Sequence, residues 1–324
     1  MNTTETAATS ALRSIVDVLA AAEHVTVLCH TRPDADTIGS GLAIAGALRR
    51  RGAVVEVSFP DSTTLPAALA ELPGADTLVE PSEVVGHPVV VTVDCASIHR
   101  LESLAAVVEA AQSSVVIDHH ASNDGFGTIN FVDPTADCTA ELVLEIIDAL
   151  EVPLDVEVAT CLYAGVVTDT GSFKWASPRS HRIAARLLEL GVDGRRWTRR
   201  LLDTHRFAWL TMVAAALDSA ELVPHAFAGR GLVYAVVDHE STAALGWEES
   251  ESVVDIVRTT SEAEVAVVFK EASPGQWTVS MRAKSDVDLV PLARIHGGGG
   301  HRLAAGYGAT GTATEVVGQL LRSV

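Results

Sequence analysis

The sequence contains little lysine, few aromatic residues and no paired cysteine motif. Only three lysines, Lys174, Lys270 and Lys284, occur among 324 residues, and 23 basic side chains stand against 42 acidic ones, for a net charge of −19. Such a charge argues against a broad electrostatic hold on duplex nucleic acid or on an anionic membrane. The five tryptophans are scattered and form no stripe on which a long single strand would stack.

Long apolar runs and targeting features are also missing. No apolar run approaches the roughly 20 residues that a membrane helix needs, and the N-terminal stretch MNTTETAATSALRS lacks the basic and apolar regions of a secretory signal. The four cysteines show no C-x-x-C spacing. We therefore expect a cytoplasmic protein with reduced thiols. Hydrophobic residues make up 48% of the chain, which excludes global disorder, and the length favours two domains.

The first half of the chain alternates short β-branched runs with Ala/Leu-rich segments of helical period. Runs such as HVTVLC (24–29) and VVVTV (89–93) are typical of a parallel α/β sheet covered on both faces. After an Arg-rich helical stretch, a mixture of strand-like and helical segments predicts a smaller α/β unit. We predict a Rossmann-like parallel-sheet domain at 1–185, a helical connector at 186–217 and a smaller α/β domain at 218–324.

Potential metal ligands follow three of the predicted strands: His30, with Asp34 and Asp36 in the next loop, then Asp94, then Asp118, His119 and His120. Because ligands bind at the carboxyl ends of parallel strands, we expect these side chains at one edge of the sheet. Individually, the loop aspartates could cap a helix, and a single histidine could be structural. The combination favours a cation site, because carboxylates packed together repel one another and resist ionisation.

Carboxylates and imidazoles without a thiolate suit two divalent cations, with Mn²⁺ favoured and Mg²⁺ or Co²⁺ as alternatives. A further candidate ligand is Asp169, where an apolar helix stops in GVVTDTGSF (165–173), although a turn aspartate has the same local pattern. Two cations about 4 Å apart clamp phosphate oxygens and turn a bridging water into hydroxide near neutral pH. The sequence therefore predicts hydroxide attack on a phosphate ester.

Four consecutive glycines, 297–300, precede His301. We expect a tight loop whose backbone N–H groups approach an anion, because such a run excludes a strand or a helix. A flexible linker is the alternative. Arg282 and Lys284, two apart on a predicted strand, should share a face and could bind phosphate, or could belong to a solvated edge strand.

Five segments resemble the motifs of DHH-family phosphoesterases that carry a DHH-associated C-terminal domain. They are, in order, HTRPDADTIGS (30–40), VDCASIHR (93–100), DHHASN (118–123), GVVTDTGSF (165–173) and GGGGHRLAAG (297–306). The length and domain set are similar to those of the NrnA-like enzymes, which are nano-RNases and 3′,5′-bisphosphate nucleotidases, some of which degrade cyclic di-AMP or its linear product. RecJ-like exonucleases usually carry additional domains, and family II pyrophosphatases lack the GGGGH loop.

The resemblance implies roles for individual residues. It implies that His30, Asp34 and Asp94 hold one metal, and that Asp36, Asp94, His119 and Asp169 hold the other, with Asp94 bridging. It also implies that His120 contacts the scissile phosphate and that Asp118 orients the imidazoles. The resemblance further implies that 218–324 is a substrate-binding domain and that the active site lies in the cleft between the two domains. The implied substrate contacts are Arg282, Lys284, Gly298, Gly299, Gly300, His301, Asn123 and Arg100. The segment MRAKSD (281–286) departs from the family's usual Arg-Ser order.

These features together predict a Mn²⁺-dependent phosphoesterase, a hydrolase of ester bonds. We expect it to cleave short oligoribonucleotides and dinucleotides, such as pApA and cyclic di-AMP, to 5′-mononucleotides, and to convert pAp into AMP and phosphate. A pyrophosphatase, a RecJ-like exonuclease and a nucleotide-binding regulatory module are the alternatives. The resemblance also suggests a homodimer, and neither duplex nucleic acid nor a membrane is an expected partner.

Overall fold

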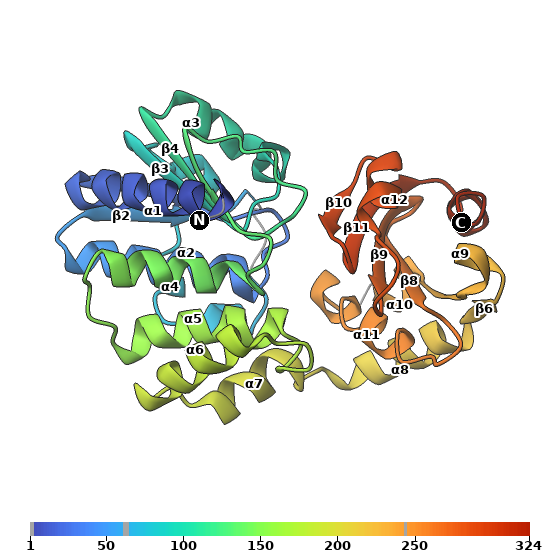
Figure 1. Cartoon of the computed structure of the whole chain (residues 1–324). Helices are drawn as coiled ribbons and strands as arrows, with labels where there is room; N and C mark the ends of the chain where they lie inside the picture. The colour runs from blue at the N-terminus through green and yellow to red at the C-terminus, as the bar shows by residue number, and fades with distance from the viewer. Residues whose placement is uncertain (1–2, 61–64, 243–244) are drawn as a thin grey trace. The chain divides into compact units, whose positions relative to one another are not determined.

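The computed structural model describes residues 3–60, 65–242 and 245–324 (Figure 1). The chain forms two compact units, residues 1–204 and 205–324. The segment 186–217, predicted as a connector, is shared between them. Trp197 of helix α7 belongs to the hydrophobic core of the first unit, whereas Met212 of helix α8 belongs to a core of the second.

The first unit is built on a parallel sheet with strand order β2-β1-β3-β4-β5. Its strands are β1 (His24–Leu28), β2 (Val54–Ser58), β3 (Val89–Val93), β4 (Ser113–Asp118) and β5 (Ile129–Val132). Its helices are α1 (Thr3–Ala21), α2 (Ala35–Arg50), α3 (Ala105–Ala110), α4 (Thr139–Ala149), α5 (Val156–Asp169), α6 (Pro178–Glu189) and α7 (Gly194–Leu202), and its 3₁₀ turns are η1 (Leu69–Glu71), η2 (Ala75–Thr77), η3 (Pro81–Glu83) and η4 (Ile98–Leu104).

Both faces of this sheet are covered, which explains why β1, β3 and β4 are buried along most of their length. In Figure 1, α2 and α4 lie against one face, with α5 outside them. On the other face, Leu101 and Leu104 of η4 and Val108 of α3 pack with Val90 of β3. In register, Leu28 pairs with Thr92, and Val93 pairs with Ile117. The residues that follow β1 and β3 and the end of β4 therefore meet at one edge of the sheet.

The second unit contains a mixed sheet with strand order β10-β11-β9-β8-β7-β6. Its strands are β6 (Glu221–Val223), β7 (Leu232–Val237), β8 (Val265–Ser273), β9 (Gln276–Ala283), β10 (Gly299–His301) and β11 (Ala304–Thr310). Its helical elements are α8 (Phe207–Asp218), α9 (Ala226–Gly229), α10 (His239–Thr242), η5 (Trp247–Ser250), α11 (Val253–Val257), α12 (Val290–Ile295) and α13 (Ala313–Leu321). Residues of α12 and α13 cover one face, and residues of α8 and α11 pack on the other.

The predicted fold class is confirmed: a parallel α/β domain is followed by a smaller α/β domain. Within the described ranges, every helix is too short or too polar to cross a lipid bilayer.

The glycine run corrects one expectation, because part of it is a strand. Gly299–His301 forms β10 and pairs antiparallel with β11. A Cβ atom at Gly298 would lie 2.0 Å from the Gly306 carbonyl oxygen, and one at Gly300, where φ is +135°, would lie 2.5 Å from that of Ala304. The glycines thus permit an approach between backbones that no other residue allows. The prediction that the run excludes a strand was wrong for this reason.

Candidate active site

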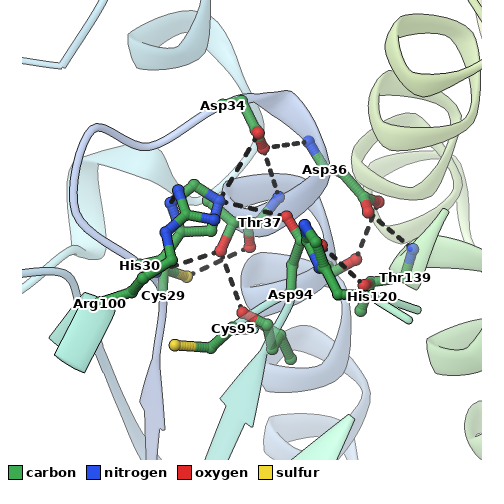
Figure 2. Close-up of polar contacts among 12 residues, drawn as sticks. Cys29, His30, Asp34, Asp36, Thr37, Asp94, Cys95, Arg100, His120 and Thr139 are labelled. Carbon is green, nitrogen blue, oxygen red and sulfur yellow. Dashed lines mark hydrogen bonds and ion pairs between the residues drawn. The ribbon is translucent and has the colours of Figure 1, made fainter. Parts of the chain in front are cut away.

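Three strand ends bring a histidine and two aspartates together at one edge of the first sheet. His30 follows β1, Asp94 follows β3, and Asp118 ends β4. All three side chains are buried, although carboxylates are rarely buried unless they are paired. Figure 2 shows Asp94 in the middle, with His30 and Asp34 on one side and Asp36 and Thr139 on the other.

Asp34 combines the two roles that its sequence position allowed. Its Oδ1 accepts hydrogen bonds from the backbone N–H groups of Asp36 (3.1 Å) and Thr37 (3.0 Å), so it caps the N-terminus of α2. Its Oδ2 lies 3.5 Å from Nε2 of His30. One oxygen therefore stabilises the helix while the other faces the histidine.

Asp94 lies between two groups of potential ligands. Its Oδ2 is 3.2 Å from Nε2 of His30, and its Oδ1 is 3.4 Å from Nε2 of His119. The hydroxyl of Thr139 also donates to Oδ1, at 3.0 Å. The backbone φ of Asp94 is +57°, a conformation that costs roughly 1–3 kcal/mol in residues other than glycine and that clusters at functional sites. The two carboxylate oxygens thus point toward different imidazoles.

Asp36 is enclosed by the start of α4 and by a glycine of α5. Its Oδ2 accepts from the backbone N–H of Thr139 (2.6 Å), and its Oδ1 accepts from that of Ala140 (2.9 Å). It therefore caps α4, whose own N-cap residue, Cys138, makes no side-chain capping bond. A Cβ atom at Gly165 would lie 2.4 Å from Oδ1 of Asp36, so only glycine leaves room for this carboxylate.

His119 links the remaining carboxylates. Its Nε2 lies 3.4 Å from Oδ2 of Asp169 and 4.0 Å from Oδ2 of Asp36. Its Nδ1 is 3.3 Å from the carbonyl oxygen of Ala136. A ring that donates Nδ1–H to a carbonyl and turns Nε2 toward carboxylates has the usual orientation of a metal-binding histidine. Nδ1 of His30 is similarly placed, 2.8 Å from the Thr31 carbonyl oxygen.

Asp118 contacts both of the histidines that follow it in the sequence. Its Oδ1 lies 2.7 Å from Nδ1 of His120 and accepts from the backbone N–H of His119 at 2.9 Å. Asn123, predicted as a substrate contact, donates its side-chain amide to Oδ2 of Asp118 (2.6 Å) and to the carbonyl of Cys95 (3.0 Å). Arg100, also predicted as a substrate contact, places Nη2 2.9 Å from Nδ1 of His30. Both residues thus contact the site from its periphery.

Charges in this cluster perturb one another strongly. Burial and the Asp94 carboxylate raise the pKa of Asp36 to about 8. Burial and Arg100 oppose protonation of His30, but Asp34 and Asp94 outweigh them and raise the pKa of His30 to about 9. Burial, and then Asp36, hold the pKa of Asp169 well above its usual value. These raised pKa values mean that Asp36, His30 and Asp169 tend to bind protons, because the cluster holds several carboxylates and little positive charge. A divalent cation would supply that positive charge in place of the protons.

The donor atoms present fit a pair of divalent cations. His30, Asp34 and Asp94 offer ligand atoms within 4.8 Å of one another, and so do Asp36, Asp94 and His119, with Asp94 common to both sets. The nearby thiol of Cys29 donates to the Thr37 carbonyl at 3.2 Å, and burial raises its pKa far above the ordinary value. Oxygen and imidazole ligands without a thiolate suit Mn²⁺ or Mg²⁺.

The residues predicted in the second unit lie on two adjoining parts of its sheet. Arg282 on β9 pairs with Ala304 on β11, which pairs in turn with His301 on β10. Directly paired residues of antiparallel strands project from the same face, so Arg282 and His301 share one. Lys284 lies beyond the end of β9, and its ammonium donates to the Thr260 carbonyl. The expectation that Arg282 and Lys284 lie on one strand and share its face is therefore not met, because β9 ends at Ala283, before Lys284.

Sequence reasoning missed Thr139, which contacts both Asp36 and Asp94, and it missed the space that Gly165 provides. Thr139 begins the helix α4. A threonine before an apolar helical run indicates only a helix start. It does not indicate contacts with Asp36 and Asp94, which lie 103 and 45 positions away in the sequence.

Comparison with known proteins agrees with the two-unit architecture. The model of the DHH family, N-terminal domain, matches residues 24–166, and that of the DHHA1 domain matches residues 230–324. The chain is 31% identical to the bifunctional oligoribonuclease and PAP phosphatase NrnA of Thermus thermophilus, over 91% of this chain and 87% of the relative. The chain belongs to the DHH family of phosphoesterases, and it is a hydrolase.

Two further similarities bear on the fold and on the range of the family. A crystal structure of an exopolyphosphatase-related protein from Bacteroides fragilis superimposes with a TM-score of 0.84, at 22% identity, over 97% of this chain and 95% of that one. The cyclic-di-AMP phosphodiesterase GdpP of Geobacillus thermodenitrificans is 24% identical over 88% of this chain and 44% of its own length. The first supports the fold alone, and the second shows that related chains occur within longer proteins.

Proposed function

We propose that the protein is a Mn²⁺-dependent phosphoesterase that hydrolyses short oligoribonucleotides and dinucleotides to 5′-mononucleotides and converts pAp into AMP and phosphate. The observation that carries this proposal is the position of Asp94, whose two oxygens face His30 at 3.2 Å and His119 at 3.4 Å. A carboxylate shared between two ligand sets would hold two cations close together, as two-cation phosphate chemistry requires.

We assign His30, Asp34 and Asp94 to one cation, and Asp36, Asp94, His119 and Asp169 to the other. When bound, two such cations neutralise phosphate charge and lower the pKa of water. Thr139 and the start of α4 hold Asp94 and Asp36 in place, and the Ala136 and Thr31 carbonyls fix the two ligating rings. His120, held by Asp118 through Nδ1, is assigned to the scissile phosphate.

The substrate class rests on relatives and on the second unit. The names of the Thermus and Geobacillus relatives specify oligoribonucleotides, PAP and cyclic di-AMP as substrates of those proteins. Arg282 and His301 share one face of a sheet whose neighbouring positions are glycine and alanine, so a phosphate or sugar can approach the backbone closely. We assign these two residues to a second phosphate of the substrate, and we expect a homodimer, which sedimentation equilibrium will test.

A direct assay tests the proposal. Purified protein is incubated with Mn²⁺, Mg²⁺ or Co²⁺ and with pAp, pApA, cyclic di-AMP, a short RNA, pyrophosphate or a long single strand, and initial rates are compared. We expect hydrolysis of pAp and of the short oligonucleotides, fastest with Mn²⁺ and abolished by a chelator. Faster turnover of pyrophosphate, or tight nucleotide binding without hydrolysis, would contradict the assignment.

A further inference from the structure

The loop that leaves α5 immediately after Asp169 has a rare backbone conformation. Three successive residues have positive φ values: Gly171 at 54°, Ser172 at 58° and Phe173 at 66°. Such a conformation is uncommon in any residue except glycine and is an outlier for a bulky side chain such as Phe173. Hydrogen bonds from the backbone N–H of Ser172 to the Val167 carbonyl (2.8 Å) and of Phe173 to the Thr170 hydroxyl (3.1 Å) hold it. The chain therefore reverses direction beside a proposed metal ligand.

This reversal places two aromatic side chains in different surroundings. Phe173 turns inward, packs against the first unit's core, and stacks on His181 with ring centroids 5.6 Å apart. Trp175 returns to the end of α5 and remains 41% exposed. The loop thus packs its smaller aromatic ring against the core, where it is partly buried, and leaves its larger ring more exposed.

The exposed indole is fixed in position. Its Nε1–H donates to the backbone carbonyl of Asp169 at 2.7 Å. A Cβ atom at Gly171 would lie 2.1 Å from the ring, so the indole lies directly on the backbone of this glycine. The carboxylate of the same Asp169 is 3.4 Å from Nε2 of His119. A rigid, partly exposed ring is therefore attached to a residue of the proposed catalytic cluster.

From these contacts we infer that Trp175 is a specificity residue that stacks on a nucleobase of the substrate. Stacking of a base on an aromatic side chain contributes about 1–3 kcal/mol, and it tolerates any base because each has a π-face. It also adds affinity without requiring positive charge, which matters in a chain of net charge −19. The inference rests on the proposed function and narrows its substrate class to phosphate esters that carry an unpaired base.

A purely structural role for Trp175 is the competing explanation, since its indole bonds to Asp169. Three substitutions separate the two. Trp175→Phe keeps an aromatic ring but removes the Nε1–H donor, Trp175→Leu keeps apolar volume without a ring, and Trp175→Ala removes both. Stacking requires that Phe retains most of the function and that Leu does not. A structural role of the indole donor requires that all three variants fail alike.

The assay compares pAp with the corresponding bisphosphate that carries an abasic tetrahydrofuran in place of the nucleoside. For Trp175→Ala and Trp175→Leu we expect kcat/KM with pAp to fall about 10-fold, mostly through KM, which corresponds to roughly 1.4 kcal/mol. The abasic substrate should be turned over as by the wild type. Equal losses on both substrates, or no loss on either, would overturn the inference. Inactivity of the wild type on every nucleotide would instead contradict the proposed function.

Indole fluorescence provides a readout that does not depend on turnover. Trp197 and Trp277 are buried, and Trp209 and Trp247 are partly buried in the second unit, so the share of dinucleotide quenching that comes from Trp175 is measured as the difference between the wild type and Trp175→Phe. We expect the quenching by a non-hydrolysable dinucleotide to fall markedly in Trp175→Phe, although that variant still binds the dinucleotide by calorimetry. Unchanged quenching in Trp175→Phe would place the bound base elsewhere.

Discussion

Removing the hydroxyl of Thr139 should weaken metal binding without removing any proposed metal ligand. In Thr139→Val the side chain keeps its shape, and the backbone N–H of residue 139 still donates to Asp36. Only the 3.0 Å hydrogen bond to Oδ1 of Asp94 is lost. Asp94 is then held less firmly in its left-handed conformation, although it is the carboxylate common to both ligand sets.

The expected size of the effect follows from two independent estimates. A hydrogen bond to a charged group contributes about 1.5–3 kcal/mol, which corresponds to roughly 10- to 150-fold in an equilibrium constant. Loss of a partner that orients a metal ligand typically costs about 10- to 100-fold in metal affinity or activity. We therefore expect Thr139→Val to bind Mn²⁺ about 10- to 100-fold more weakly and to need correspondingly more Mn²⁺ for half-maximal activity.

Calorimetric titration with Mn²⁺ measures the affinity, and urea unfolding of the metal-free protein monitors the fold. Thr139→Ser restores a hydroxyl and should recover most of the affinity. Thr160→Val is the matched control, because Thr160 is also buried on a helix but its hydroxyl donates only to the Val156 carbonyl. Wild-type Mn²⁺ affinity in Thr139→Val, or an equal loss in Thr160→Val, would refute the positioning role.

Three further predictions concern single residues. Asp94→Asn should reduce turnover to background and lower the number of bound Mn²⁺ ions. The control Asp76→Asn, which changes an exposed aspartate of η2, should do neither. Two bound ions in Asp94→Asn would exclude the shared-ligand assignment. Gly165→Ala should lower the free energy of unfolding by about 1–3 kcal/mol, because its Cβ would meet Asp36, while Gly308→Ala, with 3.9 Å of clearance, should be close to neutral in urea unfolding. Burial opposes ionisation of Glu264, but hydrogen bonds from the 284–287 backbone outweigh it and lower the pKa of this carboxyl. The ionised Glu264 therefore stabilises the fold fully above the unfolded pKa of about 4.3, and this stabilisation is lost as the pH falls through the lowered pKa. The difference in stability between wild type and Glu264→Gln should accordingly shrink from pH 6 to pH 3, and a constant difference would contradict this linkage.

Much of the first domain could be predicted because its signals are local and periodic. Strands such as Val89–Val93 are continuous apolar runs since both faces of the sheet are buried, and the residues after them fall at one edge because parallel strands share a direction. The short edge strand Ile129–Val132 was not predicted, since it has only four residues, three of them partly exposed. The chain enters α3 through the 3₁₀ segment Ile98–Leu104, where Glu102 adopts a positive φ that no sequence pattern indicates.

The least predictable features depend on contacts between distant segments. Strand β10 can pair with β11 only because their backbones approach closely, and the pattern GGGGH does not indicate which strand lies beside it. Likewise, the distance from Trp175 back to Asp169 depends on three positive φ values that a sequence pattern does not encode. Composition and periodicity report burial and local conformation, so they identify elements better than the contacts between them.

Capping and metal binding were competing explanations for Asp34 and Asp36, yet the structure makes them compatible. Asp34 caps α2 with one oxygen and faces His30 with the other, and both oxygens of Asp36 accept backbone N–H bonds at the start of α4. A carboxylate oxygen has two lone pairs, so an oxygen that accepts one hydrogen bond can still bind a cation. Substituting alanine at Asp36 would therefore remove a helix cap and a proposed ligand together. Asparagine keeps one acceptor oxygen but loses the charge, so a comparison of Asp36→Asn with Asp36→Ala separates the stability that the cap contributes from the affinity that the charge contributes.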